Sequence, residues 1–214
     1  MTTPKRVLQR ITDIGVVPVV TLGDQTLAEP LADALVGGGL PVVEITLRSP
    51  AGVPAIEALA ERDDVLVGAG SVRSSAEASA AISAGCDFIV SPGLDSSIVD
   101  IAAESGVLGI PGIATATELM QARNLGVDVV KFFPAEAAGG LAALRALAAA
   151  FPDVRFVPTG GISGATGRRY LDESFVAAVG GSWMIDDTAL ATGDWEAITE
   201  AAAEAARLGE GDRS

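Results

Sequence analysis

Short runs rich in valine and isoleucine alternate along this chain with longer alanine- and leucine-rich stretches of helical periodicity. The short runs predict eight strands, at residues 16–21, 41–47, 65–68, 88–91, 107–110, 129–133, 154–158 and 175–179. The longer stretches predict helices at 6–14, 27–36, 53–61, 76–84, 97–104, 116–123, 141–150 and near 195–208. This alternation is typical of α/β proteins with a parallel sheet.

Eight strand–helix units in 214 residues predict a (β/α)8 TIM barrel, a single domain over 1–214 that begins with a short helix and ends in a frayed tail at about 209–214. An open doubly wound sheet would alternate in the same way, but no G-x-G-x-x-G motif follows the first strand. Polar and glycine residues follow most of the strands, at 44–48, 70–71, 91–93, 111–112, 131–134, 159–161 and 180–182. Barrels gather such residues at their catalytic face, so the pattern favours an enzyme.

The composition excludes several kinds of catalytic and metal-binding site. The chain has no histidine and one cysteine, Cys86, which excludes histidine triads, internal disulfides and metal sites built from histidines or several cysteines. We expect Cys86 to be a small buried packing residue. A formal net charge of −14 disfavours a nucleic-acid partner. No apolar stretch reaches the ~18 residues that cross a membrane, and the amino end lacks the pattern of a signal peptide, so we expect a cytoplasmic protein.

Lysine occurs at only two positions, and one of them, Lys131, lies inside the apolar run 129–134. Burial disfavours the charged form of an amine, and a neutral lysine amine is the nucleophile of Schiff-base enzymes. The alternative is a lysine at a strand end whose stem packs while its head reaches water. The polar residues that follow the other strands favour Lys131 as a nucleophile.

The strand at 41–47 carries three polar residues on one face. Successive side chains of a strand point to opposite faces, so Glu44, Thr46 and Arg48 lie together, and the aliphatic residues between them point the other way. The outer face of a barrel packs on helices, so the polar face is predicted to face the interior or its mouth. Glu44 and Arg48 could form a structural ion pair there. In a chain without histidine, Glu44 is also the leading acid–base candidate, and Arg48 suits a substrate carboxylate.

Paired glycines follow the last two predicted strands, at 160–161 and 180–181. Such loops let backbone N–H groups approach an anion closely, and barrels often bind phosphate at this place. Either pair alone could be a plain turn. Their occurrence in consecutive loops predicts a phosphate site served by amides, by Ser163 or Ser182, and by helix dipoles.

Two segments resemble the signatures of the KDPG/KHG aldolases, which act on 2-keto-3-deoxy-6-phosphogluconate (KDPG) and 4-hydroxy-2-oxoglutarate (KHG). Residues 39–48, Gly-Leu-Pro-Val-Val-Glu-Ile-Thr-Leu-Arg, resemble the glutamate signature, and residues 126–136 resemble the signature of the Schiff-base lysine. Shorter blocks at 17–19, 68–72, 91–93, 110–112, 158–161 and 180–183 are similar to other family blocks in the same order. The resemblance covers about residues 8–206.

The resemblance implies a class I aldolase of the Entner–Doudoroff pathway that cleaves KDPG to pyruvate and glyceraldehyde 3-phosphate. Lys131 would form the Schiff base, and Glu44 would be the general acid–base. It also implies that the protein is a homotrimer and that its binding partner is a small-molecule substrate, a phosphorylated keto acid. No cofactor and no metal are implied.

The resemblance also assigns the substrate contacts. The pyruvyl carboxylate end would meet Arg48, Ser71 and Thr159, with Pro92 and Phe133 shaping the pocket, and the phosphate would lie on Gly160, Gly161, Gly181 and Ser182. Two residues depart from the family pattern: Ser71 replaces a common threonine, and Ala138 stands where asparagine is frequent. The loss of a methyl group at Ser71 makes an altered substrate preference a reasonable hypothesis.

Three other functions fit parts of the pattern. A KHG-type aldolase would share Lys131 and Glu44 without needing the phosphate loops. A phosphosugar isomerase on the same barrel would use carboxylates without a covalent amine. A non-catalytic phosphate-binding barrel would bind its ligand without turnover.

Overall fold

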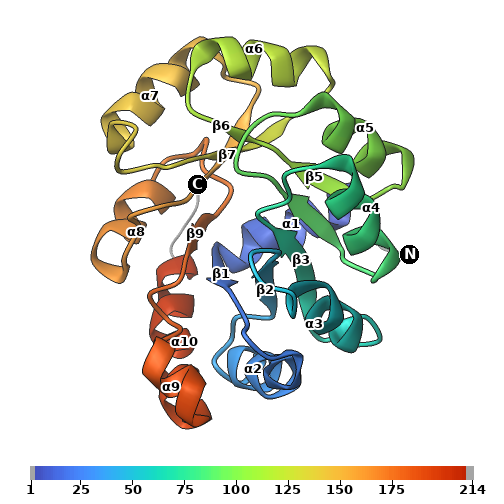
Figure 1. The fold of residues 1–214 in the computed structure, drawn as a ribbon. Coiled ribbons are helices and arrows are strands. Elements are labelled where there is room, and N and C mark those ends of the chain that lie inside the picture. Colours follow the sequence, from blue (N-terminus) through green and yellow to red (C-terminus); the bar gives the residue numbers. More distant parts are fainter. Residues whose placement is uncertain (1–2, 211–214) are drawn as a thin grey trace.

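The computed structural model describes residues 3–210 and consists of parallel strands surrounded by helices (Figure 1). The predicted α/β class is confirmed. The strands are β1 (Val16–Val20), β2 (Val42–Thr46), β3 (Leu66–Gly70), β4 (Phe88–Val90), β5 (Leu108–Ile110), β6 (Gly112–Ile113), β7 (Val129–Phe132), β8 (Arg155–Pro158) and β9 (Val179–Gly181).

Helices follow most of the strands, and several of them begin at residues whose side chains cap them. The helical elements are α1 (Pro4–Ile14), the 3-10 turn η1 (Gln25–Leu27), α2 (Ala28–Gly37), α3 (Gly52–Leu59), α4 (Ser75–Ser83), α5 (Ser96–Glu104), α6 (Ala116–Asn124), α7 (Gly140–Ala150), α8 (Gly164–Leu171), α9 (Asp187–Thr192) and α10 (Trp195–Gly209). Ser74 and Asp95 accept hydrogen bonds from backbone N–H groups in the first turns of α4 and α5, and Thr115 forms a capping box with Glu118. These bonds satisfy amides that a helix start leaves unpaired.

The strands form two curled parallel sheets instead of the single eight-stranded sheet of the predicted barrel. One sheet has the order β5-β4-β3-β2-β1-β9, and the other has the order β6-β7-β8. The two sheets meet at Pro111, which separates β5 from β6 and whose carbonyl accepts the Lys131 N–H at 2.9 Å. On the other side, isolated parallel bridges join Phe156 to Val176 and Thr159 to Gly180.

Several predicted boundaries are wrong, each for a local reason. The last strand was expected at 175–179, but β9 is Val179–Gly181, and glycines hide such a strand because they have low strand propensity. Helix α8, which contains Gly164 and Gly167, was not predicted. The frayed tail was predicted from residue 209, yet Gly209 is the buried last residue of α10. The rest of that tail, from 211, lies outside the described residues.

The buried apolar side chains form two clusters on opposite faces of the strands. The larger cluster lies toward the surrounding helices and includes Val43. The smaller cluster lies on the inner face and joins Val42 and Val129 to Val7 and Ile11 of α1. Figure 1 shows α1 behind the strands, within the ring made by the other helices. The amphipathic α1 therefore covers the inner face near the amino ends of the strands, and the carboxyl ends are left for polar residues.

Cys86 lies in the larger apolar cluster with a 5% exposed side chain, which confirms the predicted packing role. Burial, aided by the neighbouring Asp87 carboxylate, raises the pKa of its thiol from 9.0 to about 12. Across residues 3–210, no helix is long and apolar enough to span a membrane.

We expect native Cys86 to resist alkylation by iodoacetamide at pH 8. The rise in pKa from 9.0 to about 12 lowers the reactive thiolate fraction roughly 10³-fold, and burial slows access further. Mass spectrometry of timed samples, with a urea-unfolded sample as control, checks this expectation. Equally fast labelling of the native and unfolded chains would show that Cys86 is reached without unfolding.

Candidate active site

Strands β2 and β7 bring Glu44 and Lys131 together on the inner face. The Lys131 Nζ atom lies 3.3 Å from the Glu44 Oε1 atom, although the two residues are 87 positions apart in the chain. Both side chains are buried, with 6% of Lys131 and 3% of Glu44 exposed. An ion pair inside a protein is costly to desolvate, so it is weak evidence for stabilisation, and a pair of this kind is a candidate for a functional site. This buried contact between Lys131 and Glu44 is the core of the candidate site.

Glycines make the room that these two side chains occupy. A Cβ atom at Gly70 would lie 2.3 Å from the Glu44 Oε1 atom, so the carboxylate fills the space that a side chain there would need. Gly112 pairs in register with Lys131 in the neighbouring strand, and a Cβ atom there would lie 2.4 Å from the Pro92 carbonyl oxygen. Pro92 therefore packs against the backbone beside Lys131.

Phe133 and Ser71 extend the surroundings of the pair. The Lys131 Nζ atom lies 5.1 Å from the centroid of the Phe133 ring, within the range of a cation–π contact. Ser71 directly follows Gly70 and has φ 56°, a left-handed conformation that is uncommon for residues with a side chain. Strain of this kind gathers at functional sites, because surrounding contacts must maintain it.

Arg48 is held by two threonine hydroxyls at the ends of β1 and β2. Its Nη2 atom donates to Thr21 Oγ1 at 2.8 Å, and its Nε atom makes a longer bond of 3.4 Å to Thr46 Oγ1. The two hydroxyl oxygens lie 2.7 Å apart and share a hydrogen bond. The sequence analysis did not select Thr21. Its signal is parity, since Thr21 lies two residues beyond Val19 and four beyond Val17, which belongs to the inner cluster.

A hollow of about 140 Å³ collects six of the predicted substrate residues. Its lining residues come from the ends of β1, β2, β8 and β9 and are Val19, Arg48, Thr159, Gly160, Gly161, Ile162, Gly181 and Ser182. A neighbouring hollow of about 410 Å³ shares Val19, Arg48 and Ser182 with it and is also lined by Val20, Thr21, Ile185 and Asp187. Arg48 and Ser182 thus lie where the two hollows meet.

The glycine loop after β8 takes a shape that other residues resist. Gly160 and Gly161 have φ 100° and 79°, both left-handed. A Cβ atom at Gly161 would lie 2.8 Å from the Cβ atom of Glu136, while the Glu136 N–H donates to the Gly160 carbonyl at 3.1 Å. The turn after β7 therefore supports this loop from behind.

The chain's single tyrosine, Tyr170, is hydrogen-bonded away from the Lys131–Glu44 contact. Tyr170 belongs to the helix-facing cluster, and its hydroxyl donates to the Glu136 carboxylate. Burial, followed by this hydrogen bond, raises the pKa of the Tyr170 phenol well above its usual value. Over the described part of the chain, no group of three or more histidine, cysteine, aspartate or glutamate side chains is arranged to hold a metal ion.

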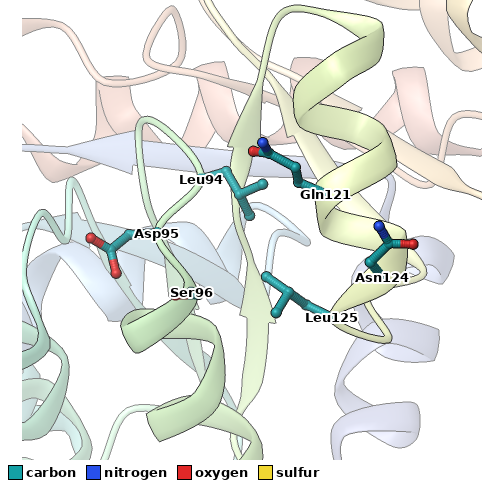
Figure 2. A pocket seen from close by; sticks show the side chains of 6 residues that line it. All are labelled: Leu94, Asp95, Ser96, Gln121, Asn124 and Leu125. Atoms are coloured by element: carbon teal, nitrogen blue, oxygen red, sulfur yellow. The ribbon is translucent and has the colours of Figure 1, made fainter.

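A larger hollow, of about 520 Å³, lies between α5 and α6 and contains none of the predicted site residues. It is lined by Leu94, Asp95, Ser96, Gln121, Asn124 and Leu125. Figure 2 shows Leu94 pointing toward α6 and Asp95 pointing away from it. The Asp95 carboxylate instead caps α5 through the N–H groups of Ser97 and Ile98. This hollow brings together no catalytic group comparable to the Lys131–Glu44 pair.

Comparison with known proteins agrees with this geometry. The family model described as KDPG and KHG aldolase matches residues 7–201. A KHG/KDPG aldolase of Escherichia coli K12 is 46% identical over 191 residues, which cover 89% of this chain and 90% of the relative.

Two solved structures share the fold. The KDPG aldolase of Zymomonas mobilis ZM4, solved with 3-phosphoglycerate, has a TM-score of 0.88 and 40% identity, and the match covers 95% of this chain and 96% of that one. The KDPG aldolase of Legionella pneumophila, solved with pyruvate captured as a covalent carbinolamine, has a TM-score of 0.89 and 38% identity, covering 94% and 97% of the two chains. The fold and the likeness together define an aldehyde-lyase. The chain belongs to the KDPG/KHG aldolase family.

Replacing Gly70 with alanine should disable the site while Lys131 and Glu44 themselves stay in the sequence. The new methyl group would displace the Glu44 carboxylate from Lys131, so kcat for aldol cleavage should fall roughly 10²-fold or more, toward the rate of Glu44→Gln. Gly23→Ala is the matched control, because its Cβ atom would meet nothing within 4 Å. Thermal unfolding should establish that both variants fold. A folded Gly70→Ala enzyme with normal kcat would mean that catalysis does not need Glu44 in this position.

Proposed function

We propose that this protein cleaves KDPG to pyruvate and glyceraldehyde 3-phosphate by forming a Schiff base on Lys131. The observation that carries the proposal is the buried contact of 3.3 Å between Lys131 Nζ and Glu44 Oε1. The adjoining hollow with its paired glycines supports a phosphorylated substrate. The names of the E. coli, Z. mobilis and L. pneumophila relatives agree with this substrate.

In the proposed reaction, the neutral Lys131 amine attacks the keto carbon of the substrate. Loss of water from the resulting carbinolamine gives an iminium ion. When the carbon–carbon bond to the hydroxyl-bearing carbon breaks, its electron pair moves into the iminium group and leaves an enamine. The iminium ion is thus the electron sink, and the step requires no metal or organic cofactor.

Glu44 is proposed to move the protons. Its carboxylate accepts the proton of the substrate's β-hydroxyl group, directly or through a water molecule, as the aldehyde product forms. It then helps to return a proton to the enamine carbon, and hydrolysis of the new iminium ion releases pyruvate and restores Lys131. The closeness of Glu44 to the Lys131 amine supports this assignment.

The remaining predicted residues are proposed to bind the two ends of the substrate. Arg48, Ser71 and Thr159 would hold the carboxylate of the pyruvyl part, because a guanidinium binds a carboxylate through two parallel hydrogen bonds and the hydroxyls add donors. Pro92 and Phe133 would shape the wall beside Lys131.

The phosphate is proposed to lie on Gly160, Gly161, Gly181 and Ser182. The left-handed conformations of Gly160 and Gly161 support close backbone approach to an anion.

Three wider features belong to the same proposal. The two sheets would act as one (β/α)8 barrel, a reading supported by the backbone bonds at Pro111 and by the bridges to Val176 and Gly180. Residues 1–214 would form a single domain. The enzyme would work in the cytoplasm as a homotrimer, as family resemblance suggests.

KHG cleavage is the second candidate, because the E. coli relative carries both substrates in its name. The purified protein should release pyruvate from both substrates, with the larger kcat/KM for KDPG. A larger kcat/KM for KHG would show that KHG, not KDPG, is the preferred substrate. Binding of either compound without pyruvate release would contradict catalysis altogether.

Ser182→Ala should separate the two substrates. Removing one hydroxyl donor to a charged phosphate costs about 1.5–3 kcal/mol, or roughly one to two decades in kcat/KM for KDPG, while KHG has no phosphate to lose. Ser96→Ala, in the remote hollow between α5 and α6, is the control. Equal losses on both substrates would show that Ser182 supports the loop and does not bind phosphate.

A further inference from the structure

Three side chains at the ends of two neighbouring strands form a continuous hydrogen-bonded group. Thr46 and Arg48 follow Glu44 on the same face of the β2 segment, and Thr21 ends the β1 segment beside them. Thr21 Oγ1 accepts from Arg48 Nη2 at 2.8 Å and lies 2.7 Å from Thr46 Oγ1. Thr21 therefore bonds to both other residues, and its bond to Arg48 is shorter than the direct bond of 3.4 Å from Arg48 Nε to Thr46 Oγ1.

Thr46 is buried and Thr21 is exposed, so the hydrogen-bonded group runs from the protein interior to its surface. Thr46 is 1% exposed, so its hydroxyl gives Thr21 a hydrogen-bond partner that is fixed in the protein interior. Thr21 and Arg48 are exposed at the surface of the hollows. An exposed arginine loses considerable side-chain freedom when it binds a ligand, and a fixed hydroxyl partner removes part of that loss in advance.

Arg48 keeps both its charge and its best donors available. Within residues 3–210, no ion pair includes Arg48, although the chain carries a net charge of −14. A guanidinium has five N–H donors. The bonds to Thr21 and Thr46 use Nη2 and Nε, which leaves both N–H groups of Nη1 and one of Nη2 for an anion.

We infer that Thr21 is a positioning residue that holds the Arg48 guanidinium at the junction of the two hollows, ready for a carboxylate of the pyruvyl type. This inference rests on the proposed role of Arg48 in binding that carboxylate. Thr21 acts through Arg48 and takes no part in the bond-breaking steps at Lys131. Thr46 anchors the arrangement from the protein interior.

The experiment measures the pyruvate concentration that half-saturates borohydride trapping, together with KM and kcat for KDPG. Thr21→Val keeps the shape of the side chain and removes the hydroxyl. It should raise the half-saturating pyruvate concentration and KM about 3- to 30-fold, the effect of one lost hydrogen bond, while kcat changes less than about twofold. Thr21→Ser, which restores a hydroxyl, should recover most of the affinity. Thr117→Val, at an exposed position of α6, is the matched control.

A double-mutant cycle with Arg48→Ala tests whether Thr21→Val weakens pyruvate binding through Arg48. In the Arg48→Ala background, Thr21→Val should cause no further loss, because the group that it positions is gone. A loss of equal size in both backgrounds would overturn the inference, as would an unchanged pyruvate affinity in Thr21→Val alone. If Arg48→Ala itself left pyruvate affinity unchanged, the carboxylate role of Arg48 would be wrong and the inference would end with it, while trapping at Lys131 and cleavage of KDPG would still stand.

Discussion

The structure depends on one contact: a lysine amine and a glutamate carboxylate held 3.3 Å apart inside the protein. Burying a polar or charged side chain without a partner costs free energy, so each group offsets part of the cost of burying the other. The contact requires β2 and β7 to face each other, an apolar inner cluster below the pair, and glycine where a side chain would collide with the carboxylate. Val42 and Val129, two residues before Glu44 and Lys131, supply that apolar base, and Gly70 supplies the space. The fold and the chemistry therefore share the same few positions.

The carboxyl ends of the strands complete this arrangement. Arg48 lies four residues beyond Glu44, just past the end of β2, and Ser182 directly follows β9, yet both line the junction of two hollows. Small residues dominate this edge, so the backbone itself forms much of the wall. The left-handed Gly160 and Gly161 are supported by Glu136, which Tyr170 holds in turn from α8. The glycine loop that is proposed to bind phosphate is thus supported by ordinary packing behind it.

The sequence predicted the alternation of strands and helices because side-chain periodicity is a local property. It also placed Glu44 on the inner face, since strand parity depends only on neighbouring residues, and it identified Lys131 as a lysine inside a buried strand. It failed where glycine hid regular structure, as in β9 and α8, and it did not predict the short strand β6 that follows Pro111. Parity alone places Thr21 on the inner face, but its importance comes from its contact with Arg48, and no local pattern predicts a contact between residues 27 positions apart. The sequence also could not predict that Arg48 and the glycine loops line one hollow, because this depends on how distant strands pack together.

The central claim is that the buried Lys131 amine is the nucleophile. The most direct measurement is borohydride reduction in the presence of pyruvate, followed by peptide mapping by mass spectrometry. The chain has only one other lysine, Lys5, so the assignment is unambiguous. We predict one reduced pyruvyl adduct per chain, on the peptide containing Lys131, and loss of both adduct and cleavage in Lys131→Ala. An adduct on Lys5, or cleavage that persists in folded Lys131→Ala, would contradict the account.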